Sequence, residues 1–186
     1  MNKLADDCFN QVEDLMSMSQ ALEILQQRVV IVTGNRLDHL PLAQAAGRIL
    51  AKNLVSVIDV PPHDNSAVDG YALRHEDLSQ HTKTTLSVQG RSAAGHPHDG
   101  ELAPGQCIRI FTGAVMPSGA DSVVMQEDVV ASNGAITIPS RLKLGANRRL
   151  QGEDNKAGDI ALKRGQRLRP QDLGLAASVG HGELSV

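Results

Sequence analysis

The sequence has few aromatic residues, two cysteines and no long apolar run, and each shortage excludes a class of protein. Aromatic residues make up 2% of the 186 residues, so stacking platforms for single-stranded nucleic acid are not expected. The formal net charge of −3 also argues against non-specific binding to nucleic acid. The lack of about 18 consecutive apolar residues predicts no membrane-spanning helix. Cys8 and Cys107 show no metal-ligand spacing, which indicates a reducing compartment, the cytoplasm.

Helical and extended signals alternate in the first 60 residues. Ser19 is suited to cap a helix, and residues 29–33 fit either a strand or a continuation of that helix. Pro41 predicts the start of a short helix that ends at Gly47. The β-branched residues within 49–58 predict a strand. The first helix would pack through an apolar face that carries Leu22, Leu25 and Val29.

Short β-like runs separated by glycine and proline dominate from residue 69 to about residue 139. The flanks of Asn133-Gly134 are rich in β formers, which predicts a hairpin there. Several short strands at such spacing are typical of a small barrel or sandwich. The expected strands cover residues 70–73, 84–89, 106–111, 122–127 and 135–138.

Helical signals return near the end of the chain. Residues 160–162 predict a strand, and Pro170 suits the first position of a helix that Gly180 ends. Residues 183–186 resemble the beginning of a further strand. We therefore expect an α+β fold, mostly β, in which a small β-barrel-like domain is inserted into an elongated, helix-containing domain. Residues 61–155 would form the inserted domain, and residues 1–60 and 156–186 the two segments of the other.

The most informative stretch is residues 61–72, which read Pro-Pro-His-Asp-Asn-Ser-Ala-Val-Asp-Gly-Tyr-Ala. Two prolines restrict the backbone angle φ at the start of this stretch. Asp64, Ser66 and Asp69 then place side-chain oxygens within six positions. Such converging oxygens would suit a metal, a phosphate-bearing ligand or an oxyanion. The same residue types also cap turns, and by themselves they favour the turn.

Two further stretches carry groups that can bind anions. Thr112 and Gly113 end a predicted strand and place a hydroxyl beside a glycine N–H, although glycine-ended strands are common. Arg148 and Arg149 precede two carboxylates, of which Asp154 is the second. This arrangement would form either a phosphate clamp or weak surface ion pairs, and the residues alone favour the ion pairs.

Other chemistry finds little support. His96, His98 and Asp99 form a small cluster, but no distant ligand is spaced to complete a zinc site. The nucleophile turn Gly-x-Ser-x-Gly, the dinucleotide fingerprint and the Walker loop are all missing from the sequence.

Four motifs in order carry a family resemblance. They are Pro-Pro-x-Asp-Asn-Ser-Ala-x-Asp-Gly-Tyr-Ala at 61–72, Ile-Arg-Ile-x-Thr-Gly-Ala at 108–114, Pro-x-Gly-Ala-Asp-x-Val-Val at 117–124 and Gly-x-Asn-x-Arg-x-x-Gly-Glu-Asp at 145–154. Together they resemble the N-terminal part of the MoeA family of molybdopterin molybdenumtransferases, which is related to the E domain of gephyrin. The resemblance runs from about residue 19 to the end.

The resemblance implies an activity and a set of residues. Members of the family insert molybdate into adenylylated molybdopterin, release AMP and require Mg²⁺. They are dimers of four-domain subunits whose cleft lies between the second domain of one subunit and the third domain of its partner. Asp69 and Thr112 match residues that line this cleft, and Asp69 is the expected magnesium ligand. Arg149 and Asp154 match residues that are also implicated in the activity of the family.

We add Asp64, Ser66 and Gly113 to the expected substrate-binding residues on physical grounds, because they lie within the same motifs. The expected partners are a second copy of the chain, through the first domain, and other proteins of molybdenum cofactor biosynthesis. The family's molybdopterin-binding third domain would begin where this chain ends. We therefore expect a fragment that is inactive by itself. Two alternatives stay open, a scaffold or dimerisation module and a ligand-binding module without catalysis.

Overall fold

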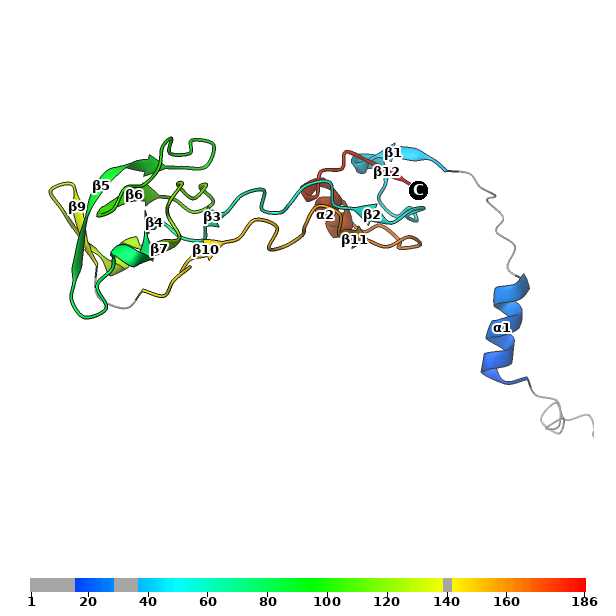
Figure 1. The fold of residues 1–186 in the computed structure, drawn as a ribbon. Coiled ribbons are helices and arrows are strands. Elements are labelled where there is room, and N and C mark those ends of the chain that lie inside the picture. Colours follow the sequence, from blue (N-terminus) through cyan, green and yellow to red (C-terminus); the bar gives the residue numbers. More distant parts are fainter. Residues whose placement is uncertain (1–15, 29–36, 139–141) are drawn as a thin grey trace, which may run out of the picture. The chain divides into compact units, whose positions relative to one another are not determined.

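The computed structural model describes residues 16–28, 37–138 and 142–186 (Figure 1). The chain divides into two compact units, Met1–Leu37 and Asp38–Val186. The predicted strand or helix at residues 29–33 lies outside the described residues. Within the described residues, no helix is both long enough and apolar enough to cross a bilayer.

The first unit contains helix α1, which spans Met18–Arg28. Ser17, not Ser19, caps this helix. The Oγ of Ser17 accepts the N–H of Gln20 at 3.2 Å, and Oε1 of Gln20 accepts the N–H of Ser17 at 2.9 Å. This reciprocal pair is a capping box, which needs Gln three residues after the cap, a spacing that Ser17 has. No residue of α1 is buried, so the expected packing of its apolar face stays a prediction.

The second unit is built around a curled, mixed sheet of six strands in the order β7-β4-β6-β5-β9-β8 (Figure 1). Strands β5 and β6 are parallel, and the other neighbours are antiparallel. This half-barrel confirms the expected mostly β fold. The strands are β4 (Gly70–Leu73), β5 (Thr84–Ser92), β6 (Gln106–Ile110), β7 (Ser122–Met125), β8 (Val130–Ser132) and β9 (Ala135–Ile138).

Alternation along the strands buries aliphatic side chains on both faces of the sheet. In β4, Leu73 packs with Leu86 and Ile136 in one cluster, whereas Ala72 packs with Ile110 in another. Successive side chains of a strand point to opposite faces, so one short strand serves two cores. The hairpin between β8 and β9 turns at Asn133 and Gly134, with φ of 50° and 76°, which confirms the predicted turn.

A third aliphatic cluster joins residues from both ends of the unit. Helix α2 (Pro170–Ser178) contributes Ala176, and Leu50 and Leu168 are buried beside it. The helix begins after Arg169, whose backbone N–H donates to Asp172 at 2.8 Å. The hydrogen bond from the Arg169 side chain contributes most to lowering the pKa of Asp172, to about 2, and the bond from this backbone N–H contributes second.

The remaining strands and turns are β1 (His39–Pro41), β2 (Leu54–Val55), β11 (Ile160–Leu162), β12 (Glu183–Ser185), and the 3-10 turns η1 (Leu42–Gln44), η2 (His75–Asp77) and η3 (Gln126–Asp128).

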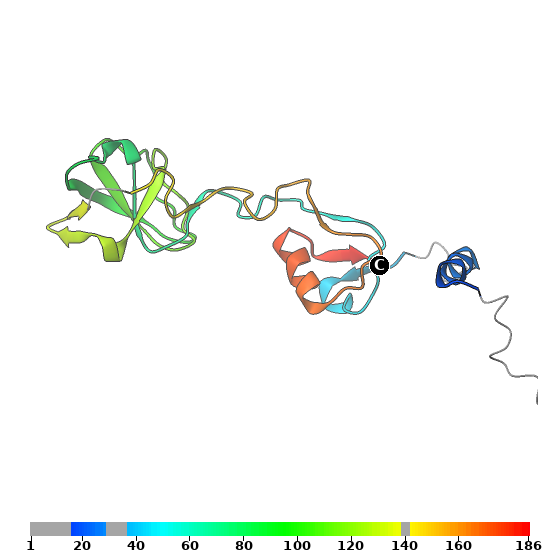
Figure 2. The ribbon, with the colours of Figure 1, turned by 90° about the horizontal axis from the view of Figure 1, so that it is seen from below.

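Two stretches of chain, residues 56–61 and 152–159, run side by side and connect the six-stranded sheet to the cluster that contains α2 (Figures 1 and 2). The N–H of Val60 donates to Asn155 O at 2.8 Å, and the N–H of Gly152 donates to Pro61 O at 2.9 Å. Strands β3 (Asn65–Ser66) and β10 (Arg148–Arg149) continue this antiparallel pairing. The expected domain boundaries after residues 60 and 155 lie in this paired region and stay a prediction.

Three expected elements differ from those observed. Residues 49–58 form only the two-residue strand β2, because the N–H groups of Leu50 and Ala51 donate to two separate partners, Gln166 and Ser185. The short helix after Pro41 is the single 3-10 turn η1. The expected strand over residues 122–127 ends at Met125, and the next residues form the 3-10 turn η3. The expected strand near the end of the chain is β12, which pairs with β1 and buries Leu184 at 2% exposure.

Candidate functional site

The carboxylate of Asp69 is held by Thr112. Asp69 directly precedes β4, and Thr112 lies just beyond the end of the neighbouring strand β6. Oδ1 of Asp69 accepts the Thr112 backbone N–H at 2.8 Å and the Thr112 hydroxyl at 2.7 Å. These two hydrogen bonds, with a smaller contribution from the charge of Arg109, lower the pKa of Asp69. No described residue donates to Oδ2, so one oxygen of an ionised carboxylate is left for a ligand.

The turn at Thr112 and Gly113 is tied to the first motif through Ser66. The N–H of Gly113 donates to Ser66 O at 2.8 Å, and the N–H of Ser66 donates to Ala114 O at 3.0 Å. The hydroxyl of Ser66, a residue with 1% exposure, donates to Val68 O at 2.6 Å. The Thr112 and Gly113 donors are therefore used inside the protein, and they form no open cradle for an anion in this structure. Their arrangement instead orients Asp69.

The motif at residues 145–154 pairs with the motif at residues 61–72 through β3 and β10. Arg148 lies opposite Ser66 in this ladder, and Arg149 lies opposite Asn65. NH2 of Arg149 donates to Asp154 Oδ1 at 2.6 Å, so the expected contact between these two residues is formed. The bond to Asp154 is the main cause that raises the pKa of Arg149. Both side chains are more than a third exposed, which leaves the remaining N–H groups of the guanidinium accessible to an anion.

Gln151 links two carboxylates of the first motif region. Its backbone N–H donates to Asp64 Oδ1 at 2.7 Å, and its side-chain amide donates to Asp59 Oδ2 at 2.7 Å. The Asp64 carboxylate also lies 3.5 Å from Nε of Arg148. Asp64 thus joins the motifs at residues 61–72 and 145–154. Sequence reasoning missed Asp59 and Gln151, because both contacts join residues about 90 positions apart.

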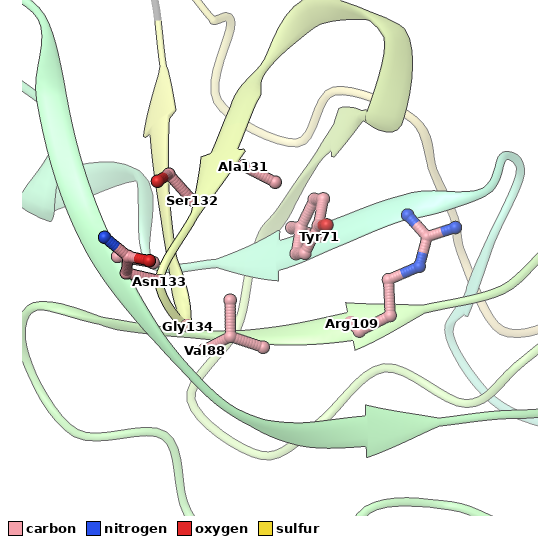
Figure 3. Close-up of a pocket in the computed structure, with 8 residues that line it drawn as sticks. Tyr71, Val88, Arg109, Ala131, Ser132, Asn133 and Gly134 are labelled. Atoms are coloured by element: carbon pink, nitrogen blue, oxygen red, sulfur yellow. The ribbon is translucent and has the colours of Figure 1, made fainter.

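Arg109 was also missed, although it lies inside the second motif. The central carbon of its guanidinium lies over two aromatic rings, 5.1 Å from the ring centroid of Tyr71 and 4.9 Å from that of Phe111. Figure 3 shows Arg109 beside Tyr71 at the edge of an open hollow of about 420 Å³. The Asn133–Gly134 turn and Val88 complete the hollow, and Arg109 carries the only charge among the described lining residues. This contact depends on the register of β4 and β6, which places Tyr71 opposite Arg109 and which no local sequence signal gives.

The described residues offer a magnesium ion one ligand at Asp69 and no closed site. In the described part of the chain, no group of three or more His, Cys, Asp or Glu side chains could hold a metal. A magnesium ion usually binds one or two carboxylates and completes its shell with water and substrate phosphate oxygens. Asp69 with its available Oδ2 fits that pattern as a single protein ligand.

Comparison with known proteins gives one consistent result. The family model described as "MoeA N-terminal region (domain I and II)" matches residues 16–180. The molybdopterin molybdenumtransferase of Haemophilus influenzae is 42% identical over 171 residues, which cover 91% of this chain and 41% of that protein. The protein of the same name from Synechococcus elongatus is 40% identical over 176 residues, which cover 92% of this chain and 43% of that protein.

The fold agrees with a solved structure of the same kind. The crystal structure of the molybdopterin biosynthesis protein MoeA from Pyrococcus horikoshii OT3 aligns with a TM-score of 0.83 and 34% sequence identity. The alignment covers 93% of this chain and 46% of that chain. The chain thus spans about two fifths of the length of the curated relatives that it matches.

Proposed function

Because this chain belongs to the MoeA family through the N-terminal region (domains I and II), we propose that it forms part of a molybdopterin molybdenumtransferase. The proposed reaction inserts molybdate into the dithiolene of adenylylated molybdopterin and releases AMP from the cleaved phosphoanhydride. The chain spans about two fifths of such an enzyme. We propose that a further region, of the kind found in the longer relatives, supplies the molybdopterin pocket and that this chain alone is inactive.

The observation that carries the proposal is the convergence of three motifs on one backbone network. Asp69 is fixed by Thr112, the turn after Thr112 is bonded to Ser66, and Ser66 lies opposite Arg148 in the β3–β10 ladder. The site that results combines an available carboxylate oxygen with a paired guanidinium, Arg149. A site for oxyanion and phosphate substrates needs a group that holds a hard cation, and it also needs a positive charge that binds the substrate oxygens.

Each residue has a proposed role in this reaction. Asp69 would hold Mg²⁺ with its available carboxylate oxygen, and the ion would supply positive charge to neutralise phosphate or molybdate oxygens. Thr112 keeps the Asp69 carboxylate ionised and oriented. Arg149 attracts a substrate oxygen while Asp154 and Glu153 hold its guanidinium. Asp64, Ser66 and Gly113 act on the substrate only indirectly, by fixing the backbone of the site.

The experiment that tests the proposed function uses a chimaera. The chain is joined to the part of the Haemophilus influenzae relative that follows the matched region, and molybdate insertion into adenylylated molybdopterin is measured. An active chimaera supports the proposal. A folded chimaera without activity, assayed beside the active relative, contradicts it.

We further propose that the protein is a cytoplasmic homodimer that works with other proteins of molybdenum cofactor biosynthesis. An exposed apolar patch supports the dimer. Val55 lies opposite Ile160 in the β2–β11 ladder, and both are exposed, together with the nearby Val57 and Ile58. An apolar patch of this kind on a small unit commonly marks an interface.

Replacement of Ile160 by Asp is expected to dissociate the dimer, because a charge buried at an apolar interface is costly. Sedimentation equilibrium measures the mass in solution, with Ile49→Asp, an exposed apolar residue outside this ladder, as the matched control. A wild-type chain that remains monomeric at about 100 μM would contradict the dimer proposal.

A further inference from the structure

The half-buried side chain of Arg109 makes several contacts around Asp69. NH1 of Arg109 donates to the carbonyl of Gly70, the residue after Asp69, at 3.3 Å. NH2 donates to Oε1 of Gln126. The backbone N–H of Gln126 in turn donates to the carbonyl of Asp69 at 3.1 Å. The guanidinium thus connects to two successive backbone carbonyls, directly to that of Gly70 and through Gln126 to that of Asp69.

The guanidinium is itself held in place. It lies over the rings of Tyr71 and Phe111, and both cation–π contacts favour this position of the guanidinium. Gln126 is oriented by a second hydrogen bond, since its Nε2 donates to Glu127 at 2.9 Å and leaves Oε1 to Arg109. The Asp69 carboxylate is fixed separately by Thr112, three residues after Arg109 on the same strand end. Backbone and side chain of Asp69 are therefore fixed from one segment, residues 109–112.

We infer that Arg109, through Gly70 and Gln126, is a positioning residue for Asp69. The inference rests on the proposed function only for its effect on the reaction. Lysine cannot replace arginine in this role, because an ammonium group lacks the fork that reaches two acceptors while it stacks on a ring. A misplacement of about 1 Å in a reacting constellation can cost about 100-fold in rate.

Two substitutions at Arg109 separate its charge from its geometry. Arg109→Lys keeps the charge and loses the fork, and Arg109→Gln loses both. Arg164→Gln makes the same change of charge at an exposed residue outside the sheet and is the matched control. The pKa of the Asp69 carboxyl is measured in the 186-residue chain by NMR titration, and insertion is measured in the chimaera.

The expected results differ between the variants. Arg109→Gln raises the pKa of Asp69 because a nearby positive charge is lost, whereas Arg109→Lys leaves it close to that of the wild type. Both variants lower kcat for insertion by about 10-fold to 100-fold, with a smaller effect on KM. Arg164→Gln changes neither the pKa nor the rate. If Arg109 had a merely structural role, both variants would lower the stability of the fold. They would then not combine a lower insertion rate with a pKa of Asp69 that changes in Arg109→Gln alone.

Gln126→Leu tests the same contact without changing any charge, and it serves where an Arg109 variant fails to fold. It keeps the backbone N–H that binds Asp69 O and removes the partner of Arg109. The expected result is a displaced NMR signal of the Asp69 carboxyl and a rate about 10-fold lower. Unchanged Asp69 signals and pKa in both Gln126→Leu and Arg109→Gln would overturn the inference. An inactive wild-type chimaera would contradict only the proposed function, because the NMR readout does not depend on it.

Discussion

Replacement of Asp69 by Asn is expected to lower molybdate insertion by at least about 100-fold while the fold is retained. Asparagine has nearly the same shape, and its carbonyl oxygen can still accept the two hydrogen bonds from Thr112. What is lost is the negative charge that the available oxygen would present to a hard cation and to the substrate. Because Thr112 lowers the pKa of Asp69, the wild-type carboxylate stays ionised throughout a neutral assay.

The measurement is steady-state insertion in the chimaera, with circular dichroism and thermal unfolding to verify the fold. Asp128→Asn is the matched control, since Asp128 is an exposed carboxylate in the 3-10 turn after β7. The control is expected to keep full activity. An Asp69→Asn chimaera that is as active as the wild type would remove Asp69 from the mechanism and leave its contact with Thr112 as a purely structural one.

Replacement of Gly70 by Ala is expected to destabilise the protein by about 3 kcal/mol or more, the largest stability effect that we predict. A Cβ atom at Gly70 would lie 1.9 Å from Val124 O and 3.2 Å from the Cα of Met125. Both contacts are with backbone atoms of β7, which a rotamer change cannot relieve. The substitution therefore forces β4 and β7 apart where their ladder begins, next to Asp69.

Urea-induced unfolding followed by circular dichroism measures this effect. Gly174→Ala is the matched control, because no atom lies within 4 Å of a Cβ built at this exposed helical glycine. The control is expected to gain about 0.5 to 1 kcal/mol, since alanine favours helix more than glycine does. Equal unfolding midpoints for Gly70→Ala and the wild type would show that the close approach of β4 and β7 does not exist in solution.

The strands of the half-barrel were predictable from the sequence because local signals determine them. Asn133 and Gly134 both adopt the positive φ that such a hairpin turn requires, and these residue types adopt it readily. Glycine and proline separated the other strands in the same way. The strand predicted over residues 49–58 was wrong, because a composition rich in β-branched residues predicts a strand wherever it occurs. A long strand also needs one continuous partner strand. Leu50 and Ala51 bond to two different segments and so form no long ladder.

The candidate site was only partly predictable. The family resemblance indicated Asp69, Thr112, Arg149 and Asp154, and the structure places the members of each pair in contact. The uses of Gln151 and Arg109 could not be found from the sequence, because they depend on which residues oppose one another after folding. Tyr71 and Arg109 stack only because the β4–β6 register places them opposite each other. The family resemblance indicated the components of the candidate site, and strand register decided their connections.

The most direct test of the central claim is an insertion assay with the chain alone and with the chain mixed with the separately produced remainder of the Haemophilus influenzae relative. We expect no molybdenum cofactor from the chain alone or from the remainder alone, and formation of the cofactor with release of AMP from the mixture or the covalent chimaera. This result would mean that Asp69 and Thr112 supply one side of a divided site. Cofactor formation by the chain alone would contradict the account, because the whole site would then lie within these 186 residues.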